Sequence, residues 1–321
     1  MLEKVFRLKE NGTNARTEII AGITTFMTMA YILAVNPSVL ADAGMDQGAV
    51  FTATALAALI GTLLMAFCAN YPFALAPGMG LNAYFAYTVV LGMGYRWEVA
   101  LTAVFIEGII FIVLSLTNVR EAIFNAIPQN LKAAVSVGIG LFIAFIGLQN
   151  AKIVIGGSTL LQLFSVESYN EVNGVEASFQ DAGITVLLAV IGILITGFLV
   201  IKNVKGNILW GILITWILGI ICQFTGLYVP NPELGFYGFI PDFSSGLSIP
   251  SLSPIFVKLE FSRIYSLEFL VVIIAFLFVD MFDTIGTLTA FSSKANMMDE
   301  NGRLTNIGGA LLPATIGTTA G

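Results

Sequence analysis

Residues 71–84 read YPFALAPGMGLNAY, a stretch in which prolines and glycines interrupt apolar residues. It opens an apolar block long enough to cross a membrane, yet two prolines and two glycines fall within nine of its residues. A continuous helix cannot form there, because proline removes a backbone donor and glycine lowers helix propensity. The pattern predicts an extended stretch through Ala76, followed by a half-helix that starts near Gly78 or Gly80. A short loop followed by a plain helix is the alternative.

Backbone that is not helical is tolerated at membrane depth only where protein buries it or where it lines a cavity. The free amides at the start of the half-helix are then available to a polar ligand. Asn82, in the first turn, offers both a donor and an acceptor. We therefore predict a binding element that contains Ala76, Gly78, Gly80 and Asn82.

The composition of the whole chain indicates a polytopic membrane protein. Of its 321 residues, 57% are hydrophobic and only 11% are charged, whereas about a quarter of an average soluble domain is charged. The net charge is −6 and the sequence contains no basic run, which together exclude nucleic acid as a partner. The chain has no histidine, and Cys68 and Cys222 lie far apart, so a zinc site, a histidine base and a redox CxxC pair are excluded. We interpret both cysteines as small buried hydrophobic residues.

Apolar blocks of about 20 residues predict an all-α membrane protein with about eight complete helices and part of a ninth. The predicted helices cover 18–36, 50–69, 72–91, 98–117, 131–151, 182–201, 206–228 and 267–292, with another starting near 307. The first block lacks a small-residue cleavage site and is followed by further spans, so we do not interpret it as a signal peptide.

The distribution of lysine and arginine predicts a cytoplasmic N-terminus, because basic residues near spans stay on the cytoplasmic side. In this orientation ten of the 14 bases lie inside and four lie outside. The inside bases are Lys4, Arg7, Lys9, Arg16, Arg120, Lys132, Lys202, Lys205, Lys294 and Arg303; the outside bases are Arg96, Lys152, Lys258 and Arg263. Segments 153–181 and 229–266 then face outward as solvated connections. Within the second, 251–265 fits a short amphipathic helix at the interface.

The predicted helix 267–292 carries a polar stripe. Asp280, Asp283, Thr284 and Thr287 are spaced i, i+3, i+4 and i+7, so they share one helical face. Two carboxylates one turn apart in a low-dielectric site cannot both ionise cheaply, so at least one is expected to hold a proton near neutral pH. That favours proton-coupled transport and the recognition of N–H donors. A pair that only ties helices together and a sodium site are the alternatives.

Other polar residues inside apolar blocks carry weaker signals. Glu107 is a bundle-stabilising partner or a ligand contact, and its role is not decided by the sequence. Thr24, Thr28 and Tyr31 share a face of the first helix, which ends in Asn36-Pro37. These hydroxyls either line a cavity or bond back to their own helix.

Three motifs in order carry a family resemblance. They are APGMGLNAYF at 76–85, GITTFMTMAY at 22–31 followed by Asn36-Pro37, and Asp280-x-x-Asp283-Thr284-x-Gly286-Thr287. Together they resemble the purine permeases of the nucleobase:cation symporter 2 superfamily, within the xanthine/uracil permease superfamily. The chain is most similar to the AzgA-like adenine/guanine/hypoxanthine permease branch, along essentially its whole length.

The resemblance implies a fold of fourteen helices in two inverted repeats of seven, divided into a core domain and a gate domain. Residues 1–17 are then a cytoplasmic N-terminus, 18–129 core helices 1–4, 130–229 gate helices 5–7, 230–266 an extracellular connection and 267–321 core helix 8 with part of helix 9. The family's glutamate motif of helix 10 is expected after Gly321. We interpret the chain as C-terminally truncated, and leave open whether it transports by itself.

The resemblance also implies a function, namely uptake of guanine, hypoxanthine or adenine by proton symport with alternating access. It assigns purine recognition to Asn82, Asp280 and Asp283, and we add Ala76, Gly78, Gly80 and Thr28 as neighbouring substrate-binding residues. The two aspartates are expected to carry the coupled proton. No cofactor other than H⁺ is expected, and the expected partners are a purine base, the bilayer of a bacterial inner membrane and, as an open arrangement, a second copy of the chain.

Three other functions compete with proton-coupled purine uptake. Sodium-coupled nucleobase transport would use the same oxygens. An anion transporter of the related fold needs a base near the half-helix, and none lies there. An intramembrane aspartyl protease places its acids on separate helices, whereas Asp280 and Asp283 share one. Which purine is preferred does not follow from the residues.

Overall fold

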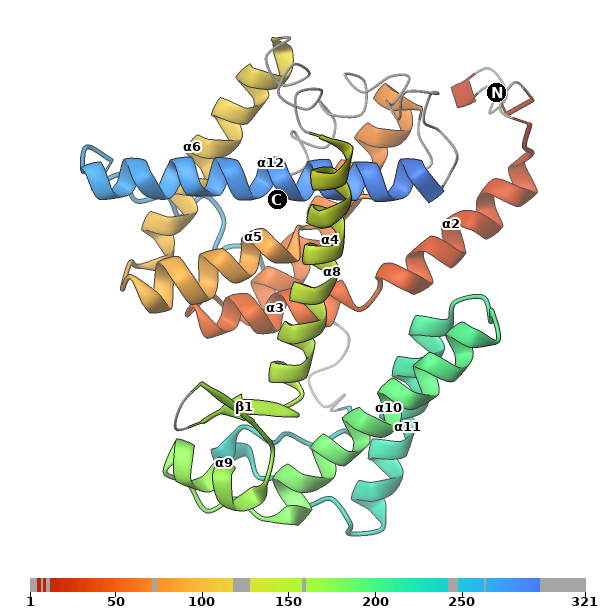
Figure 1. Cartoon of the computed structure of the whole chain (residues 1–321), viewed down its shortest axis with the longest axis vertical. Helices are drawn as coiled ribbons and strands as arrows, with labels where there is room; N and C mark the ends of the chain where they lie inside the picture. The colour runs from red at the N-terminus through yellow and green to blue at the C-terminus, as the bar shows by residue number, and fades with distance from the viewer. Residues whose placement is uncertain are drawn as a thin grey trace. The chain divides into compact units, whose positions relative to one another are not determined.

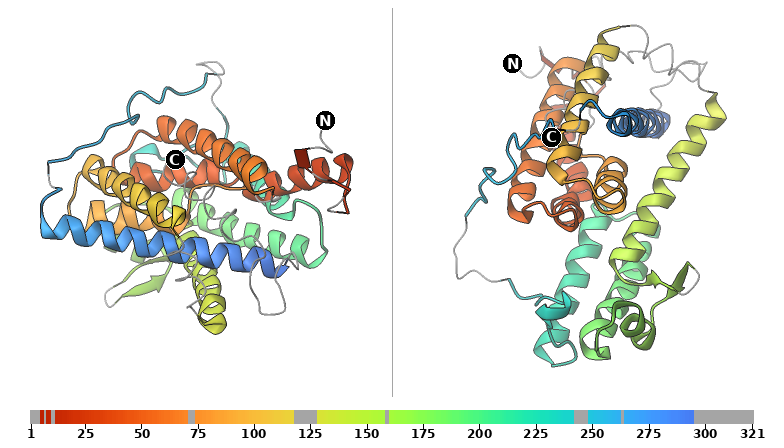
Figure 2. Two further views of the ribbon diagram at one scale, coloured as in Figure 1. Left: turned by 90° about the horizontal axis from the view of Figure 1, so that it is seen from above. Right: turned by 90° about the vertical axis from the view of Figure 1, so that its left-hand side faces the viewer.

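The computed structural model describes residues 5–6, 8–9, 12–70, 74–117, 128–157, 160–241, 248–262 and 264–294. The chain folds into two units, each of which packs mainly against itself (Figures 1 and 2). Unit 1 comprises Met1–Phe142 with Ile249–Gly321, and unit 2 comprises Ile143–Ser248. The predicted helix near 307 lies outside the described residues, as do Lys4, Arg7, Arg120, Arg263 and Arg303. The assignment of residues to a core and a gate domain stays a prediction.

Unit 1 is built from helices, two of which have starts that are capped by side chains. They are α2 (Ala15–Met29), α3 (Ile32–Asp42), α4 (Gln47–Leu64) with its π-helical continuation (Met65–Ala69), α5 (Met79–Ala83) continued by a π-helix (Tyr84–Gly92), α6 (Trp97–Leu116) and α12 (Leu267–Lys294). The Asn14 side chain accepts a hydrogen bond from Thr17 N, and Asp46 accepts one from Ala49 N, as expected of N-caps. Helix α8 (Gln129–Asn150) runs from unit 1 into unit 2.

Within the described residues, five helical stretches are long and apolar enough to cross a membrane. They are Ala15–Asp42, Gln47–Cys68, Trp97–Leu114, Phe179–Ile201 and Asn207–Phe224. The first prediction, a helix over 18–36, was too short. The helix resumes after a turn at Ala30 and Tyr31 and continues to Asp42, because Pro37 is accommodated inside α3. The next turn includes Gly44, where φ is +88°.

The core of unit 1 lies where α12 crosses α6 and α5 and where α3 packs against α4 and α5 (Figure 1). Phe276 on α12 and Ala103 on α6 are fully buried. The ring of Phe276 meets that of Tyr84 edge to face, with 5.1 Å between centroids, an arrangement that aromatic pairs favour. This packing fixes α12 against the half-helix that starts at Met79.

Residues 251–265 were predicted to form a short amphipathic helix, and this was wrong: the described residues of this range form turns and irregular backbone. The backbone of segment 248–262 is held by other elements instead of by its own helix. Glu260 N donates to Thr102 Oγ1 at 2.8 Å, and Thr52 Oγ1 donates to the Pro250 carbonyl at 2.8 Å. Val257 has a φ of +52°, which no right-handed helix allows.

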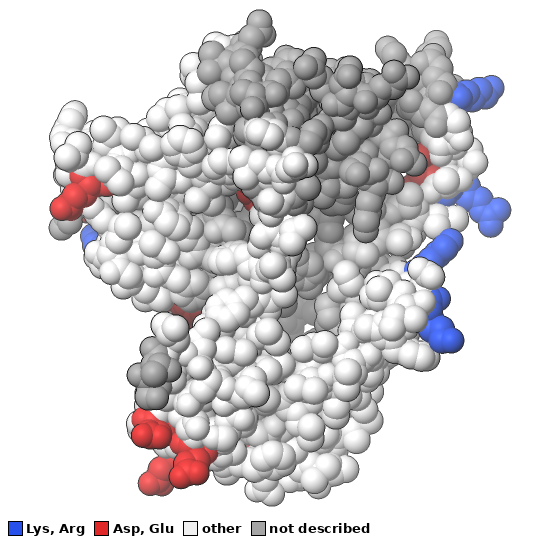
Figure 3. All heavy atoms as spheres, viewed as in Figure 1, with Lys and Arg blue, Asp and Glu red and all other residues white. Residues whose placement is uncertain are grey.

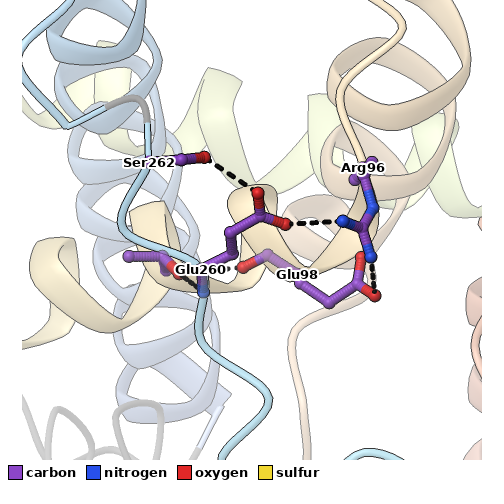
Figure 4. A network of polar contacts seen from close by, with 5 residues as sticks. Arg96, Glu98, Glu260 and Ser262 are labelled. Atoms are coloured by element: carbon purple, nitrogen blue, oxygen red, sulfur yellow. Dashed lines mark hydrogen bonds and ion pairs between the residues drawn. The ribbon is translucent and has the colours of Figure 1, made fainter.

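An ion-pair network attaches the same segment to the start of α6 (Figure 4). Arg96 contacts Glu260 at 3.0 Å and Glu98 at 2.7 Å, while Ser262 Oγ donates to Glu260 at 2.8 Å. Residues 248–262 thus contact α4 and α6 near their first residues and lead directly into α12.

Unit 2 is centred on the antiparallel pair α10 (Ile184–Ile201) and α11 (Asn207–Phe224), seen side by side in Figures 1 and 2. The two helices approach through reciprocal glycine–threonine contacts. Gly192 faces Thr215, Gly211 faces Thr196, and each threonine hydroxyl donates to the carbonyl of the glycine four residues before it. Small residues allow this close packing of membrane helices.

Enlarging one of these glycines should therefore destabilise unit 2. A Cβ on Gly192 would lie 2.5 Å from Thr215 Oγ1 and 2.9 Å from its Cγ2, whereas a Cβ on Gly197 of the same helix meets nothing within 4 Å. We expect Gly192→Val to cost about 1–3 kcal/mol of stability through overpacking and Gly197→Val to cost little. Thermal unfolding of both variants in detergent checks this, and equal melting temperatures would refute the packing described.

The connection 153–181 is more structured than the predicted solvated loop. It contains two short antiparallel strands, β1 (Val154–Gly156) and β2 (Leu161–Leu163), helix α9 (Val166–Asn173) and the start of a π-helix (Phe179–Gly183). The all-α prediction is corrected to this extent. The apolar residues of the segment form a small core with the end of α11 and with residues beyond it, which include a 3₁₀ turn (Pro232–Leu234).

A lysine is part of this small core. The Lys152 ammonium lies 3.6 Å from the ring centroid of Phe236 and 5.2 Å from that of Tyr169, which is a cation–π arrangement. Burial lowers the pKa of Lys152, and the nearby Asp181 carboxylate acts in the opposite direction. Asp181 itself closes a capping box with Ser178 at the start of the π-helix. The charged groups thus stabilise the small core of unit 2 and the start of the π-helix.

Candidate functional site

The extended stretch predicted before the half-helix is present and is tied to α4. Leu75 N donates to Thr62 Oγ1 at 3.0 Å, and Thr62 Oγ1 donates to the Leu75 carbonyl at 3.3 Å. One hydroxyl thus satisfies both polar groups of a residue that lies outside any helix. Gly78 has extended backbone angles and α5 begins at Met79, which confirms the predicted start.

The Asp283 carboxylate lies directly against the start of α5. A Cβ built on Gly78 would be 2.6 Å from Asp283 Oδ2, and one built on Gly80 would be 4.0 Å from Oδ1. Only glycine at 78 therefore leaves room for the carboxylate in this position. A negative charge at a helix N-terminus is favourable, and α5 has no side-chain cap of its own. Two elements singled out from the sequence, separated by about 200 residues, are thus brought together.

The second acid of the stripe is buried more deeply. Asp280 is 4% exposed, while Asp283 and Thr284 are half-buried and Thr287 is exposed. All four belong to the single helix α12, as predicted. The stripe therefore passes from the interior of unit 1 to its surface, with the carboxylate of Asp283 between the two.

Asn82 is linked to α3 through its side chain. Its Nδ2 donates to Asn36 Oδ1, and Asn36 Nδ2 donates to Thr54 Oγ1 on α4 at 2.8 Å. The sequence predicts Asn36 at the outer end of the first helix and gives it no part in the site. It is instead 3% exposed in the middle of α3, and the sequence signals were an amide within an apolar block and its place in the family motif of the first helix.

Thr28 and Ala76 are the remaining residues that were predicted to bind the substrate. Thr28 Oγ1 donates to the Thr25 carbonyl at 2.7 Å, and Thr24 Oγ1 donates to the Ile20 carbonyl, so both hydroxyls bond back to α2. Ala76 is half-buried and packs against the core of unit 1. The contacts of Thr28 do not join it to Asp283 or Asn82, and its role in binding stays a prediction.

Glu107 is a third acid in the interior of unit 1. It lies in α6, which packs against α12, and it is completely buried. Within the part of the chain that the structure describes, no group of three acids or cysteines is arranged to hold a metal ion. The prediction that both cysteines are buried was wrong for Cys68, which is exposed in the π-helical continuation of α4, while Cys222 is half-buried against the small core of unit 2.

The chain belongs to the Permease family, whose sequence model matches residues 16–321. It is 47% identical over its whole length to the permease MJ0326 of Methanocaldococcus jannaschii, covering 67% of that protein. It is 44% identical over 97% of its length to the guanine/hypoxanthine permease PbuG of Bacillus subtilis, covering 67% of it. The adenine permease AdeP of Escherichia coli is 36% identical over the whole chain, which covers 66% of AdeP.

These similarities confirm the resemblance read from the three motifs. They place the chain in a family of membrane transporters rather than of enzymes, which sets the intramembrane protease aside. The chain spans about two thirds of the length of these three relatives.

Proposed function

We propose that the protein takes up purine nucleobases and that the base binds between the start of α5 and the acids of α12. The observation that carries the proposal is the Asp283 carboxylate held against Gly78 at the break in the third predicted span. The printed names of PbuG and AdeP, which are guanine/hypoxanthine and adenine permeases, support the substrate class.

The chemistry of the site suits a purine. Carboxylate oxygens accept hydrogen bonds from ring and exocyclic N–H groups, and hydrogen bonds that involve a charged acceptor are stronger than neutral ones. Asp283 and the buried Asp280 supply such acceptors from α12, and Asn82 supplies an amide from α5. Gly78 leaves room for the Asp283 carboxylate at the start of α5.

We further propose proton symport with alternating access. Two acids one turn apart on α12 can share a proton, and binding of the coupled proton would lower the negative charge that the site carries across the membrane. The division of the chain into a discontinuous unit 1, which contains the site, and a separate unit 2 is what a core moving against a gate would need. Sodium coupling through the same oxygens is the competing proposal.

A substrate panel tests the proposed function. The full-length protein would be expressed in cells that lack purine uptake, and the import of radiolabelled hypoxanthine, guanine and adenine would be measured beside uracil and an anionic solute such as sulfate. We expect at least one purine to be imported and to be displaced only by other purines. Import of uracil or sulfate without purine import would contradict the proposal.

Unit 2 supports the proposed orientation with a cytoplasmic N-terminus. Its exposed Lys202 and Lys205 lie in the turn between α10 and α11, while exposed Glu167, Glu171 and Glu176 lie around α9 at the other end of the helix pair. Figure 3 shows the basic and acidic groups gathered at these two ends. Bases are retained on the cytoplasmic side, so the turn 202–206 would face inward and α9 outward.

Cysteine labelling checks this orientation. In a variant without Cys68 and Cys222, we expect a membrane-impermeant maleimide added to intact cells to label Glu171→Cys but not Lys205→Cys. Lysis of the cells should make the second site reactive, because both positions are exposed. Labelling of Lys205→Cys alone in intact cells would reverse the proposed topology.

A further inference from the structure

A buried chain of hydrogen bonds runs from the backbone of α4 through α3 to the half-helix α5. Thr54 Oγ1 donates to the Val50 carbonyl at 2.7 Å, Asn36 Nδ2 donates to Thr54 Oγ1 at 2.8 Å, and Asn82 Nδ2 donates to Asn36 Oδ1. Thr54 is 2% exposed and Asn36 is 3% exposed. This chain of hydrogen bonds ends at Asn82, whose half-buried side-chain amide belongs to the proposed site.

The direction of this chain follows from its first link. A backbone carbonyl can only accept, and two oxygens 2.7 Å apart need a hydrogen between them, so the single hydrogen of Thr54 points to Val50. The Thr54 oxygen must then accept from Asn36, which turns the Asn36 NH₂ toward α4 and its oxygen toward α5. Asn82 in turn must present its NH₂ to that oxygen. The orientation of both amides is thus set by the hydrogen-bond network.

We propose that this chain holds the Asn82 carbonyl oxygen toward the substrate, so that Asn82 reads an N–H group of the base. The inference rests on the proposed function, because it takes Asn82 as part of the purine site. Asn36 and Thr54 are then positioning residues, since they act on the base only through Asn82. In the reverse orientation Asn82 would offer N–H and would read a ring nitrogen or carbonyl acceptor of the base.

The consequence is a site that offers acceptors from two helices. The Asn82 oxygen on α5 and the Asp283 carboxylate on α12 would both bind N–H groups. A base whose N–H is blocked by a methyl group would leave the facing acceptor of the site buried without a partner. The site therefore discriminates strongly against such a base. Selectivity for the N–H edges of the purine would thus depend on residues that do not touch it.

Two isosteric substitutions on α4 separate this role from a general effect on the helix. Thr54→Val keeps the shape but removes the acceptor for Asn36, so the Asn82 amide loses its fixed orientation. Thr52→Val is the matched control, because Thr52 donates to the Pro250 carbonyl and takes no part in the chain. Thr54→Ser restores the hydroxyl and should behave as the wild type does.

The measurement is competition against radiolabelled hypoxanthine uptake by the full-length protein. One set of competitors carries a methyl group on a single ring N–H, and another replaces a single ring nitrogen acceptor with C–H. We expect the wild type to discriminate against at least one methylated competitor. In Thr54→Val that discrimination should fall by about fivefold, the effect of losing one neutral hydrogen bond, and it should be retained in Thr52→Val and Thr54→Ser. The ratio of inhibition constants does not depend on the amount of protein in the membrane.

Three results would overturn the inference while leaving the proposed function intact. They are a wild type that accepts all methylated competitors, a Thr54→Val variant with unchanged ratios, and a change confined to competitors that lack a ring nitrogen. The last would mean that Asn82 offers its NH₂. A wild type that imports no purine would instead refute the proposed function itself, and the inference would fall with it.

Discussion

Replacement of Gly78 by alanine is expected to lower purine uptake by about tenfold or more, the effect of losing one hydrogen bond to a charged group. The added Cβ would lie 2.6 Å from Asp283 Oδ2, closer than carbon and oxygen can approach, so the carboxylate must shift away from Gly78. Gly78 has a φ of −74°, which alanine adopts freely, and the backbone itself is therefore not strained. Uptake of radiolabelled hypoxanthine by the full-length variant measures the loss.

Gly80→Ala is the matched control for this prediction. Its Cβ would be 4.0 Å from Asp283 Oδ1, an ordinary van der Waals distance, and alanine raises helix propensity inside α5. We expect Gly80→Ala to retain most of the uptake and Gly78→Ala to be present in the membrane in similar amount but with the lowered uptake. Equal uptake by the two variants would show that Asp283 does not work from its position against Gly78.

Neutralising the acids of α12 should have the second large effect. Asp280→Asn keeps the size of a residue that is 4% exposed but removes its charge and its ability to carry a proton. If the pair binds the base and the proton, uptake by the wild type rises as the pH falls. The variant should lose about tenfold to a hundredfold of the uptake, as expected when a charged hydrogen bond is lost. Its residual uptake should no longer depend on pH.

The same substitution elsewhere on α12 provides the control. Glu268 lies in the first turn and is exposed, so Glu268→Gln removes a carboxylate without touching the site. It should leave both the rate and the pH profile of hypoxanthine uptake unchanged. Unchanged uptake and pH profile in Asp280→Asn would remove that residue from the mechanism. Asp283→Asn, measured in parallel, shows whether the two acids act as a pair.

The break at residues 74–78 and the start of α5 could be predicted from the sequence because proline and glycine restrict the backbone locally. The shared face of Asp280 and Asp283 was predictable for a similar reason, since helical periodicity depends only on spacing. Local rules of this kind also located most of the apolar helices, although they misplaced ends such as that of α3, where Pro37 is tolerated.

Interactions between distant segments could not be predicted in this way. The contact between Gly78 and Asp283 and the link from Asn82 to Asn36 depend on how α3, α5 and α12 pack, which no local pattern specifies. The attachment of 248–262 to Thr102 replaced a predicted amphipathic helix, because tertiary hydrogen bonds overrode the apolar and charged pattern. The strands after Lys152 were missed for a related reason: strands of three residues are too short to show periodicity.

In the proposed mechanism, this permease moves a purine together with a proton through the site between α5 and α12. The most direct test uses the purified full-length protein in liposomes, with radiolabelled hypoxanthine and an imposed gradient of either protons or sodium. We expect accumulation above the external concentration when the proton gradient is directed inward, its collapse with a protonophore, and no accumulation by Asp283→Asn under the same gradient. Accumulation that needs sodium, or equal uptake with and without a proton gradient, would contradict it.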